Sequence, residues 1–205
     1  MLRAIQDNLQ AIYRIAAPDV RRFVIDEDQL RSVLGDPDRD AQEWVLVREG
    51  PDGVDVGVYV AAQALERLRP MSGPFEALDD AFDAFCVATE GVSHFMMLFE
   101  RARRGEPVSM LELETQAEVD KFVFATLHHP ERAQEWHSRI FQHARLAEGL
   151  SEDEITRYTE AGRLAGAFCA ELCARPHTGA ILDLLRSFWR DSGSQRMDRL
   201  RRLAA

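Results

Sequence analysis

A chain of 205 residues, 46% of them hydrophobic, is long and apolar enough for one folded domain, or for one domain with a small appendage. Its formal net charge of −10 at pH 7 repels phosphate backbones, so we expect no nucleic-acid partner. No apolar run reaches the roughly 20 residues that span a bilayer, and Asp7 and Gln10 interrupt the stretch that a signal peptide would need, so we expect a soluble, cytoplasmic protein without membrane contacts.

The N-terminal third of the chain predicts a helix followed by a small antiparallel β-meander. Apolar residues at helical spacing predict a helix over residues 2–16, and Asp26 can cap a short helix that runs to Leu34. β-branched runs predict three strands, at 20–25, 44–47 and 54–60. The Gly, Pro and Asp residues of 49–53 make the last two strands a hairpin, and the first strand could complete a three-stranded sheet.

The remainder of the chain is expected to be helical almost to its end. A Pro- and Gly-rich segment at residues 70–74 marks the best internal boundary. The periodicity predicts helices at 61–68, 75–103, 109–128, 131–148, 152–175, 178–190 and 194–203. Ser151 and Glu154 form a capping-box pattern that places the start of the helix at 152–175. Short connections favour antiparallel neighbours, and hence a helical bundle.

These elements together predict a mainly α protein of the α+β class, in which a small N-terminal antiparallel β-meander packs with a C-terminal helical bundle. We divide the chain into residues 1–70, with the first helix and the three-stranded meander, and residues 71–205, with the bundle. The two segments could also pack as one domain.

Two polar side chains fall on helix faces that are otherwise apolar. On a helical wheel Glu118 shares a stripe with Phe122, and His137 lies within an apolar arc beside Phe141. An unpaired carboxylate on such a face is costly, so it must be satisfied, protonated or used in function. We hypothesise that Glu118 and His137 meet in the bundle interior. Three further residues could join them: Glu114, His143 and His94.

Several chemistries are compatible with that pair. Carboxylates and imidazoles from facing helices are typical of metal sites in bundles, and such ligands suit iron, zinc or manganese. The pair could instead do acid–base chemistry without a metal. A Glu–His hydrogen bond could also simply hold two helices in register, or Glu118 could pair with Lys121 or an arginine. The chain has no Glu-x-x-His, which the di-iron bundle pattern requires.

Glu90 and His94 are four residues apart and therefore share one face of their helix. Charged residues occupy the same face: Glu76, Asp79, Asp83 and Arg101. That pattern predicts an ordinary solvated side. The neighbours Val87, Met97 and Leu98 could bury it in a bundle, so both residues stay candidate ligands.

The basic residues are almost all arginine, and Lys121 is the only lysine, a bias that we attribute to a GC-rich coding sequence rather than to a mechanism. No phosphate-binding, dinucleotide-binding, zinc-protease or hydrolase motif occurs, and whether the protein is an enzyme stays open.

Two functions compete. The first is an interaction or regulatory module that acts through a protein partner or self-association, to which the hairpin could offer an edge strand. The second is a metal- or small-ligand-binding bundle, which could be an enzyme. Its candidate ligands are Glu118, His137, Glu114, His94, Glu90 and His143. The second predicts that Glu118 and His137 share a ligand or a hydrogen bond, whereas the first predicts that they are separately paired. We favour the first, because a bundle fold carries no function by itself.

Overall fold

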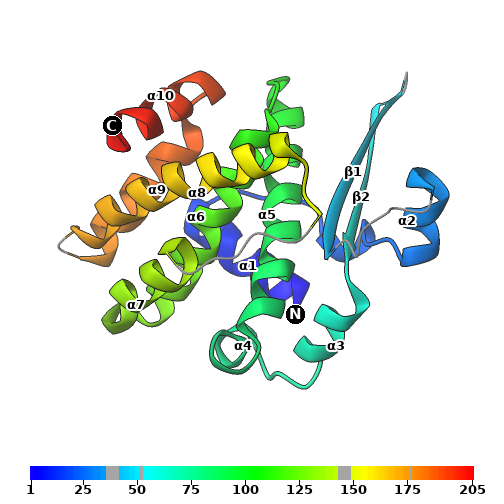
Figure 1. Ribbon diagram of the computed structural model, residues 1–205, viewed down its shortest axis with the longest axis horizontal. Helices are drawn as coiled ribbons and strands as arrows, with labels where there is room; N and C mark the ends of the chain where they lie inside the picture. The colour runs from blue at the N-terminus through cyan, green and yellow to red at the C-terminus, as the bar shows by residue number, and fades with distance from the viewer. Residues whose placement is uncertain (36–41, 51–52, 143–148, 176) are drawn as a thin grey trace.

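The computed structural model describes residues 1–35, 42–50, 53–142, 149–175 and 177–205. These residues form ten α-helices and one two-stranded antiparallel sheet, which confirms the mainly α, α+β class. The sheet lies on one side of the central helices and the C-terminal helices on the other (Figure 1). In the described part of the chain, no helix is both long and apolar enough to cross a membrane.

The helices and strands follow the predicted order closely. The helices are α1 (Leu2–Tyr13), α2 (Glu27–Leu34), α3 (Ala62–Leu68), α4 (Pro74–Asp80), α5 (Phe82–Arg104), α6 (Met110–His128), α7 (Ala133–His137), α8 (Glu152–Cys173), α9 (Thr178–Arg190) and α10 (Gly193–Leu203). The hairpin consists of β1 (Glu43–Gly50) and β2 (Gly53–Val60). Asp26 caps α2 as expected, and the capping box expected at Ser151 is present, because each side chain accepts a backbone N–H at the first turn of its helix.

The third strand expected at residues 20–25 is wrong. Asp19 caps a 3₁₀ turn at Val20–Arg22, and only Val24 forms a bridge, parallel to Val58 of β2. Asp26 then caps α2, so too few extended residues lie between the two caps for a strand. The sheet of the described residues therefore has two strands, and the meander is reduced to a hairpin with one bridge.

Two long predicted helices are also interrupted. The helix expected at 75–103 is broken at Ala81, whose φ of −141° and ψ of 41° leave the helical region between α4 and α5. The apolar periodicity continues across this residue, so the pattern could not reveal the break. The segment expected at 131–148 holds a 3₁₀ turn (Pro130–Arg132), α7 and a π-helical turn (Ser138–Gln142), and residues 143–148 lie outside the described residues.

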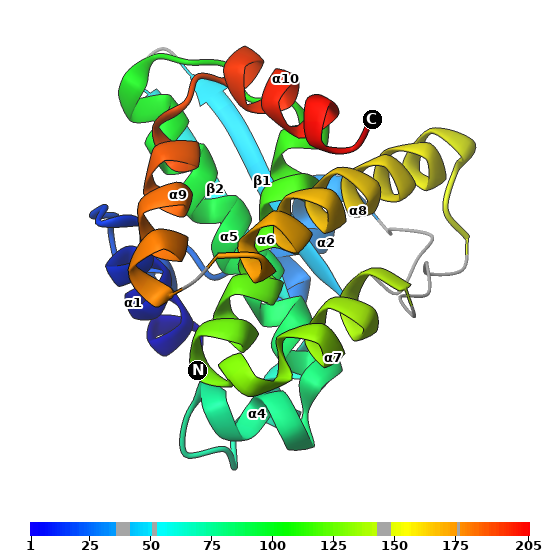
Figure 2. The same cartoon turned by 90° about the vertical axis from the view of Figure 1, so that its left-hand side faces the viewer.

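Helix α6 is the most enclosed element of the fold. From Glu112 to Thr126 every residue except Glu118 is buried, and α6 packs against α5 on one side and α8 on another (Figure 2). Over this stretch the helix is therefore buried on nearly every side, in contrast to the single apolar stripe that the wheel suggests. Its polar side chains must find partners inside the protein, because an unpaired buried polar group is unfavourable.

One set of partners is centred on Asp120, which is buried. Tyr13 of α1 donates its hydroxyl hydrogen to one carboxylate oxygen, and Gln116 donates to the same oxygen at 2.7 Å. Ser93 of α5 donates to the other oxygen at 2.6 Å, and Arg196 of α10 donates to the Gln116 carbonyl. Burial raises the pKa of Asp120 to about 6, although these hydrogen bonds oppose the shift. The network joins four helices through polar contacts in the core.

The Asp120→Ala variant should lose about 3 kcal/mol of unfolding free energy, because three buried donors lose their acceptor. Urea unfolding followed by circular dichroism measures this loss. The matched control is Asp7→Ala, which removes a surface ion pair with Arg3 and should change stability by less than about 1 kcal/mol. Equal effects of the two substitutions would show that the network does not stabilise the fold.

Candidate metal centre

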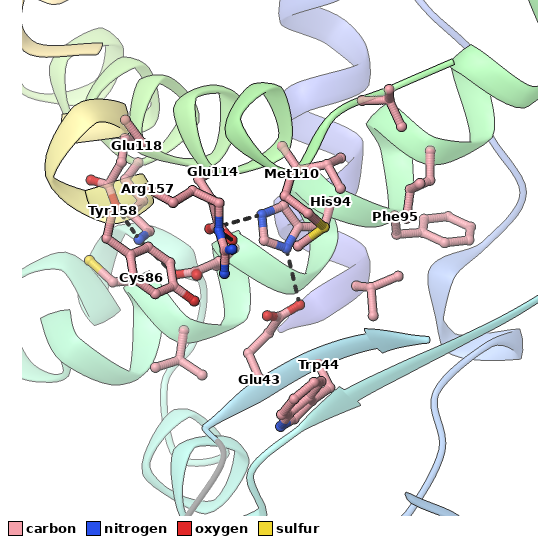
Figure 3. A pocket seen from close by; sticks show the side chains of 18 of the residues that line it. Glu43, Trp44, Cys86, His94, Phe95, Met110, Glu114, Glu118, Arg157 and Tyr158 are labelled. Carbon is pink, nitrogen blue, oxygen red and sulfur yellow. Dashed lines mark hydrogen bonds and ion pairs between the residues drawn. The ribbon is translucent and has the colours of Figure 1, made fainter. Parts of the chain in front are cut away.

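Four side chains from three elements converge on one buried point. Glu90 and His94 lie one turn apart on α5, and Glu114 faces them from α6, with their ligand atoms all within 4.8 Å of one another. Glu43 reaches the same imidazole from the start of β1 (Figure 3). His94 Nδ1 lies 3.4 Å from Glu43 Oε1, and His94 Nε2 lies 3.6 Å from Glu114 Oε2. The imidazole thus stands between two carboxylates.

Gly91 allows β1 to approach α5 closely enough for this arrangement. A Cβ atom added at Gly91 would lie 3.2 Å from Glu43 Cγ and 3.3 Å from Val60 Cγ2, which is tighter than ordinary contact. Glu43 and Val60 are opposite each other in the hairpin, so the end of the sheet rests on this glycine. The absence of a side chain at position 91 therefore brings the Glu43 carboxylate to the next turn of the helix, where His94 lies.

The site is buried, and two of its polar atoms are unsatisfied. His94 is 5% exposed and Glu114 is 4% exposed. Among the described residues, His94 Nε2 and Glu43 Oε1 are both shielded from solvent and lack a hydrogen-bond partner. The 3.4 and 3.6 Å separations around the ring exceed those of well-formed hydrogen bonds. Buried polar atoms of this kind are rare in native proteins, and one recognised reason for them is an ion.

Burial and neighbouring charges together shift the pKa values of the cluster strongly. Burial raises the pKa of Glu114 to about 7, and the nearby charges of Glu90 and Glu43 act in the same direction. Burial also raises the pKa of Glu43. Burial opposes protonation of His94, but the carboxylates of Glu43 and Glu114 outweigh it and raise the pKa of His94 to about 9. Without a cation, the cluster therefore retains protons at neutral pH.

Glu118 and Lys121 form the adjoining part of the site. Lys121 is 8% exposed, and its Nζ donates to Glu90 Oε2 at 2.7 Å and to Glu118 Oε1 at 2.8 Å. Burial opposes the charged form of this lysine, but the two carboxylates raise the pKa of Lys121 well above its ordinary value. Burial likewise opposes ionisation of Glu90, but Lys121 and His94 lower the pKa of Glu90. Glu118 thus has the lysine partner that the sequence offered as one alternative.

The other predicted residues take different places. His137 Nε2 donates to the Gly166 carbonyl at 2.9 Å, and its ring meets the edge of Phe122. Glu118 and His137 are therefore separately paired, as the interaction module predicted, so a ligand site can be argued only from the other candidates, Glu90, His94 and Glu114. His143 lies outside the described residues. The solvated face expected around His94 is wrong, because β1 covers that face at Gly91.

Three site residues were missed by sequence reasoning. Glu43 shares a strand face with Val45, but nothing local to the strand indicates that this face meets His94. Arg157 of α8 places Nε 3.7 Å from Glu114 Oε1, and Tyr158 follows it in the same wall. A charged residue at the edge of a long amphipathic helix gives no signal of such a role.

The cluster is reached from a cleft of about 2890 Å³ between the hairpin and the helices α5, α6 and α8. Its lining includes Glu43, His94 and Glu114, together with apolar side chains such as Val45 and Leu113. Carboxylates combined with one imidazole suit divalent manganese, iron or zinc. Comparisons with protein-family models, curated proteins and solved structures found no match, so the functional argument rests on this geometry.

The stability of the metal-free protein should fall as the pH rises through the site's pKa values. The folded protein holds protons that the unfolded chain releases, from about 4.5 to about 7 at Glu114 and from about 6.5 to about 9 at His94. Stability from these groups is therefore greatest at acid pH and is lost through those two windows. Urea unfolding at a series of pH values with a chelator present measures the slope. Glu114→Gln should reduce the slope of unfolding free energy against pH between about 4.5 and about 7. An unchanged slope in that variant would contradict the raised pKa of Glu114.

Proposed function

We propose that this protein binds one divalent transition-metal ion through Glu90, His94 Nε2 and Glu114. The observation that carries the proposal is the buried Nε2 of His94, which has no hydrogen-bond partner among the described residues and lies among carboxylate oxygens within 4.8 Å. Once it gives up its proton, this imidazole nitrogen can bind a metal ion together with the two acidic ligands.

Glu43 supports the proposal as an outer partner of the proposed ligand His94. A histidine that binds a metal through one ring nitrogen usually donates the other N–H to a carboxylate, which fixes the tautomer and the ring orientation. His94 Nδ1 lies 3.4 Å from Glu43 Oε1, on the side of the ring away from Glu114. With an ion bound at Nε2, the proton on Nδ1 would face Glu43, which would give the usual carboxylate–histidine–metal order.

The charge balance also favours a cation. Four carboxylates (Glu43, Glu90, Glu114 and Glu118) are close to three basic groups, His94, Lys121 and Arg157. A divalent ion would displace the protons that Glu114 and His94 hold because of their raised pKa values, and metal binding would release them.

The cleft supports a role beyond stabilising the fold. Catalytic zinc sites have three protein ligands and one open position, whereas structural zinc sites are closed by four ligands. Here the side chains of all three residues contribute to the cleft wall, although Nε2 of His94 is itself shielded, so an ion bound at Nε2 could take a further ligand from the cleft. We therefore extend the proposal to a small-ligand site, with the ion as the group that contacts the ligand.

The direct test is metal content and calorimetric affinity for Mn²⁺, Fe²⁺ and Zn²⁺ in the purified protein and in histidine variants. We expect near one equivalent of metal in the parent and loss of binding in His94→Ala, because Nε2 is a ligand. His137→Ala is the matched control and should bind like the parent, since its imidazole is bonded to Gly166. Glu43→Gln should weaken binding about 10–100-fold, as outer partners of metal ligands do.

A parent protein that binds none of the three ions would contradict the proposal. Equal losses in His94→Ala and His137→Ala would also contradict it, because they would indicate a general effect on folding.

The interaction module stays a second candidate, and the hairpin favours it. Val47 is 46% exposed and Val54 is 49% exposed on the described part of the hairpin. Within the described residues β1 pairs only with β2, so its other edge could accept a strand from a second copy of the chain.

Sedimentation velocity over a range of concentrations tests self-association through this surface. We expect a dimer that is lost in the Val47→Lys/Val54→Lys variant, with Ile155→Lys on α8 as the control, since Ile155 is 43% exposed elsewhere. A parent that stays monomeric at all concentrations would remove the support for this candidate.

A further inference from the structure

The only lysine of the chain lies inside the candidate metal centre. The sequence has 25 lysine and arginine residues, and every one except Lys121 is arginine. Lys121 is also 8% exposed, which is unusual for a lysine. Chance placement of a sole lysine would most often put it on the surface, so its position calls for a physical reason.

That reason is visible in the contacts of Lys121. Its ammonium donates hydrogen bonds to Glu90 Oε2 at 2.7 Å and to Glu118 Oε1 at 2.8 Å. Glu90 also belongs to the group with His94 and Glu114. One carboxylate is therefore shared between the proposed metal position and the lysine ammonium, in the way that a bridging carboxylate is shared between two metal ions.

Two-metal bundle sites give a comparison for the side chains around this point, although the chain lacks their Glu-x-x-His pattern. Such sites use four glutamates and two histidines from the bundle helices, and the two ions lie about 3.5–4 Å apart. Here one strand and two helices bring together four glutamates, one histidine and one lysine: Glu43, Glu90, Glu114, Glu118, His94 and Lys121. The lysine supplies a positive charge among these carboxylates.

We propose that the ammonium of Lys121 occupies the second cation position of this carboxylate cluster, so that the protein holds one metal ion where its ligands would otherwise hold two. This inference rests on the proposed metal-binding function and specifies its stoichiometry. In this arrangement Glu90 would contact both the metal ion and the Lys121 ammonium, whereas Glu118 would contact only the lysine.

The choice of lysine over arginine follows from shape. An ammonium is a compact point charge with three donors, whereas a guanidinium is a planar fork that spreads its charge over a larger group. A compact ammonium between two carboxylates therefore replaces a metal ion more closely than a planar guanidinium does. This explains why the chain departs from arginine at this one position.

The test is the number of ions bound by the parent and by charge variants, from elemental analysis and Mn²⁺ titration followed by electron paramagnetic resonance. We expect one ion in the parent and two in Lys121→Met, with the second giving the spectrum of a coupled manganese pair. The double variant Glu118→Gln/Lys121→Met should return to one ion, because the second position loses a carboxylate. Arg139→Met removes a positive charge from the cleft wall without touching these carboxylates, and it should bind one ion.

The outcomes separate this inference from the proposed function. A parent that binds no ion contradicts the proposed function itself. A parent that binds one ion, together with a folded Lys121→Met variant that also binds one, overturns the inference and leaves the metal site standing. A parent that binds two ions overturns it as well.

A second measurement uses the parent and does not depend on any variant folding. Because the chain has one lysine, protein labelled with ¹⁵N-lysine gives a single side-chain ammonium signal that needs no assignment. Zn²⁺ should shift this signal until one equivalent is bound, and Mn²⁺ should broaden it beyond detection. If the position and width of this signal stay unchanged when one equivalent of either ion is bound, Lys121 lies away from the metal and the inference is overturned.

Discussion

The enclosure of α6 on all sides is the constraint on which the rest of the structure depends. This helix carries six ionisable or amide side chains between Glu112 and Lys121, and nearly all of them are buried. A buried polar group without a partner is unfavourable, so the surrounding elements must provide partners in every direction. Toward α1 and α10 the partners form the network of Asp120, and toward β1 they form the cluster of Glu114 and Lys121.

Helix α5 serves both clusters through consecutive residues. Ser93 points to Asp120, whereas its neighbour His94 points to Glu114 and Glu43. The two clusters nevertheless differ in an important respect. The carboxylate of Asp120 accepts hydrogen bonds on both oxygens, but Nε2 of His94 has no hydrogen-bond partner among the described residues, only a 3.6 Å contact with Glu114. The hydrogen-bonded carboxylate stabilises the fold, whereas a buried imidazole nitrogen without a hydrogen bond suits a ligand, and this contrast is the basis for proposing a metal at the second cluster only.

Local patterns predicted much of the fold, because they depend on neighbours in the chain. The hairpin, the helix cap at Asp26, the capping box at Ser151 and most helices were predictable in this way. The break at Ala81 was not predictable, because the apolar spacing continues through it.

For the site, the sequence analysis named Glu90, His94 and Glu114, and the structure brings these three residues together. The pair expected at the centre of the site, Glu118 and His137, is separated. A wheel assumes one buried face, and it fails for a helix that is buried all round. Glu43 could not be found, since its role depends on the close approach at Gly91. The sole lysine was visible in the composition, but only its contacts show that its position matters.

The central claim is that a divalent ion lies between Glu90, His94 and Glu114. The most direct measurement is a crystal structure of the Mn²⁺-loaded protein with anomalous scattering recorded at the manganese edge. The account predicts one anomalous peak at ligand distance from His94 Nε2 and from oxygens of Glu90 and Glu114, with Glu43 on the Nδ1 side of the ring. A protein that takes up manganese but shows its peak elsewhere, or shows none within reach of His94, would contradict it.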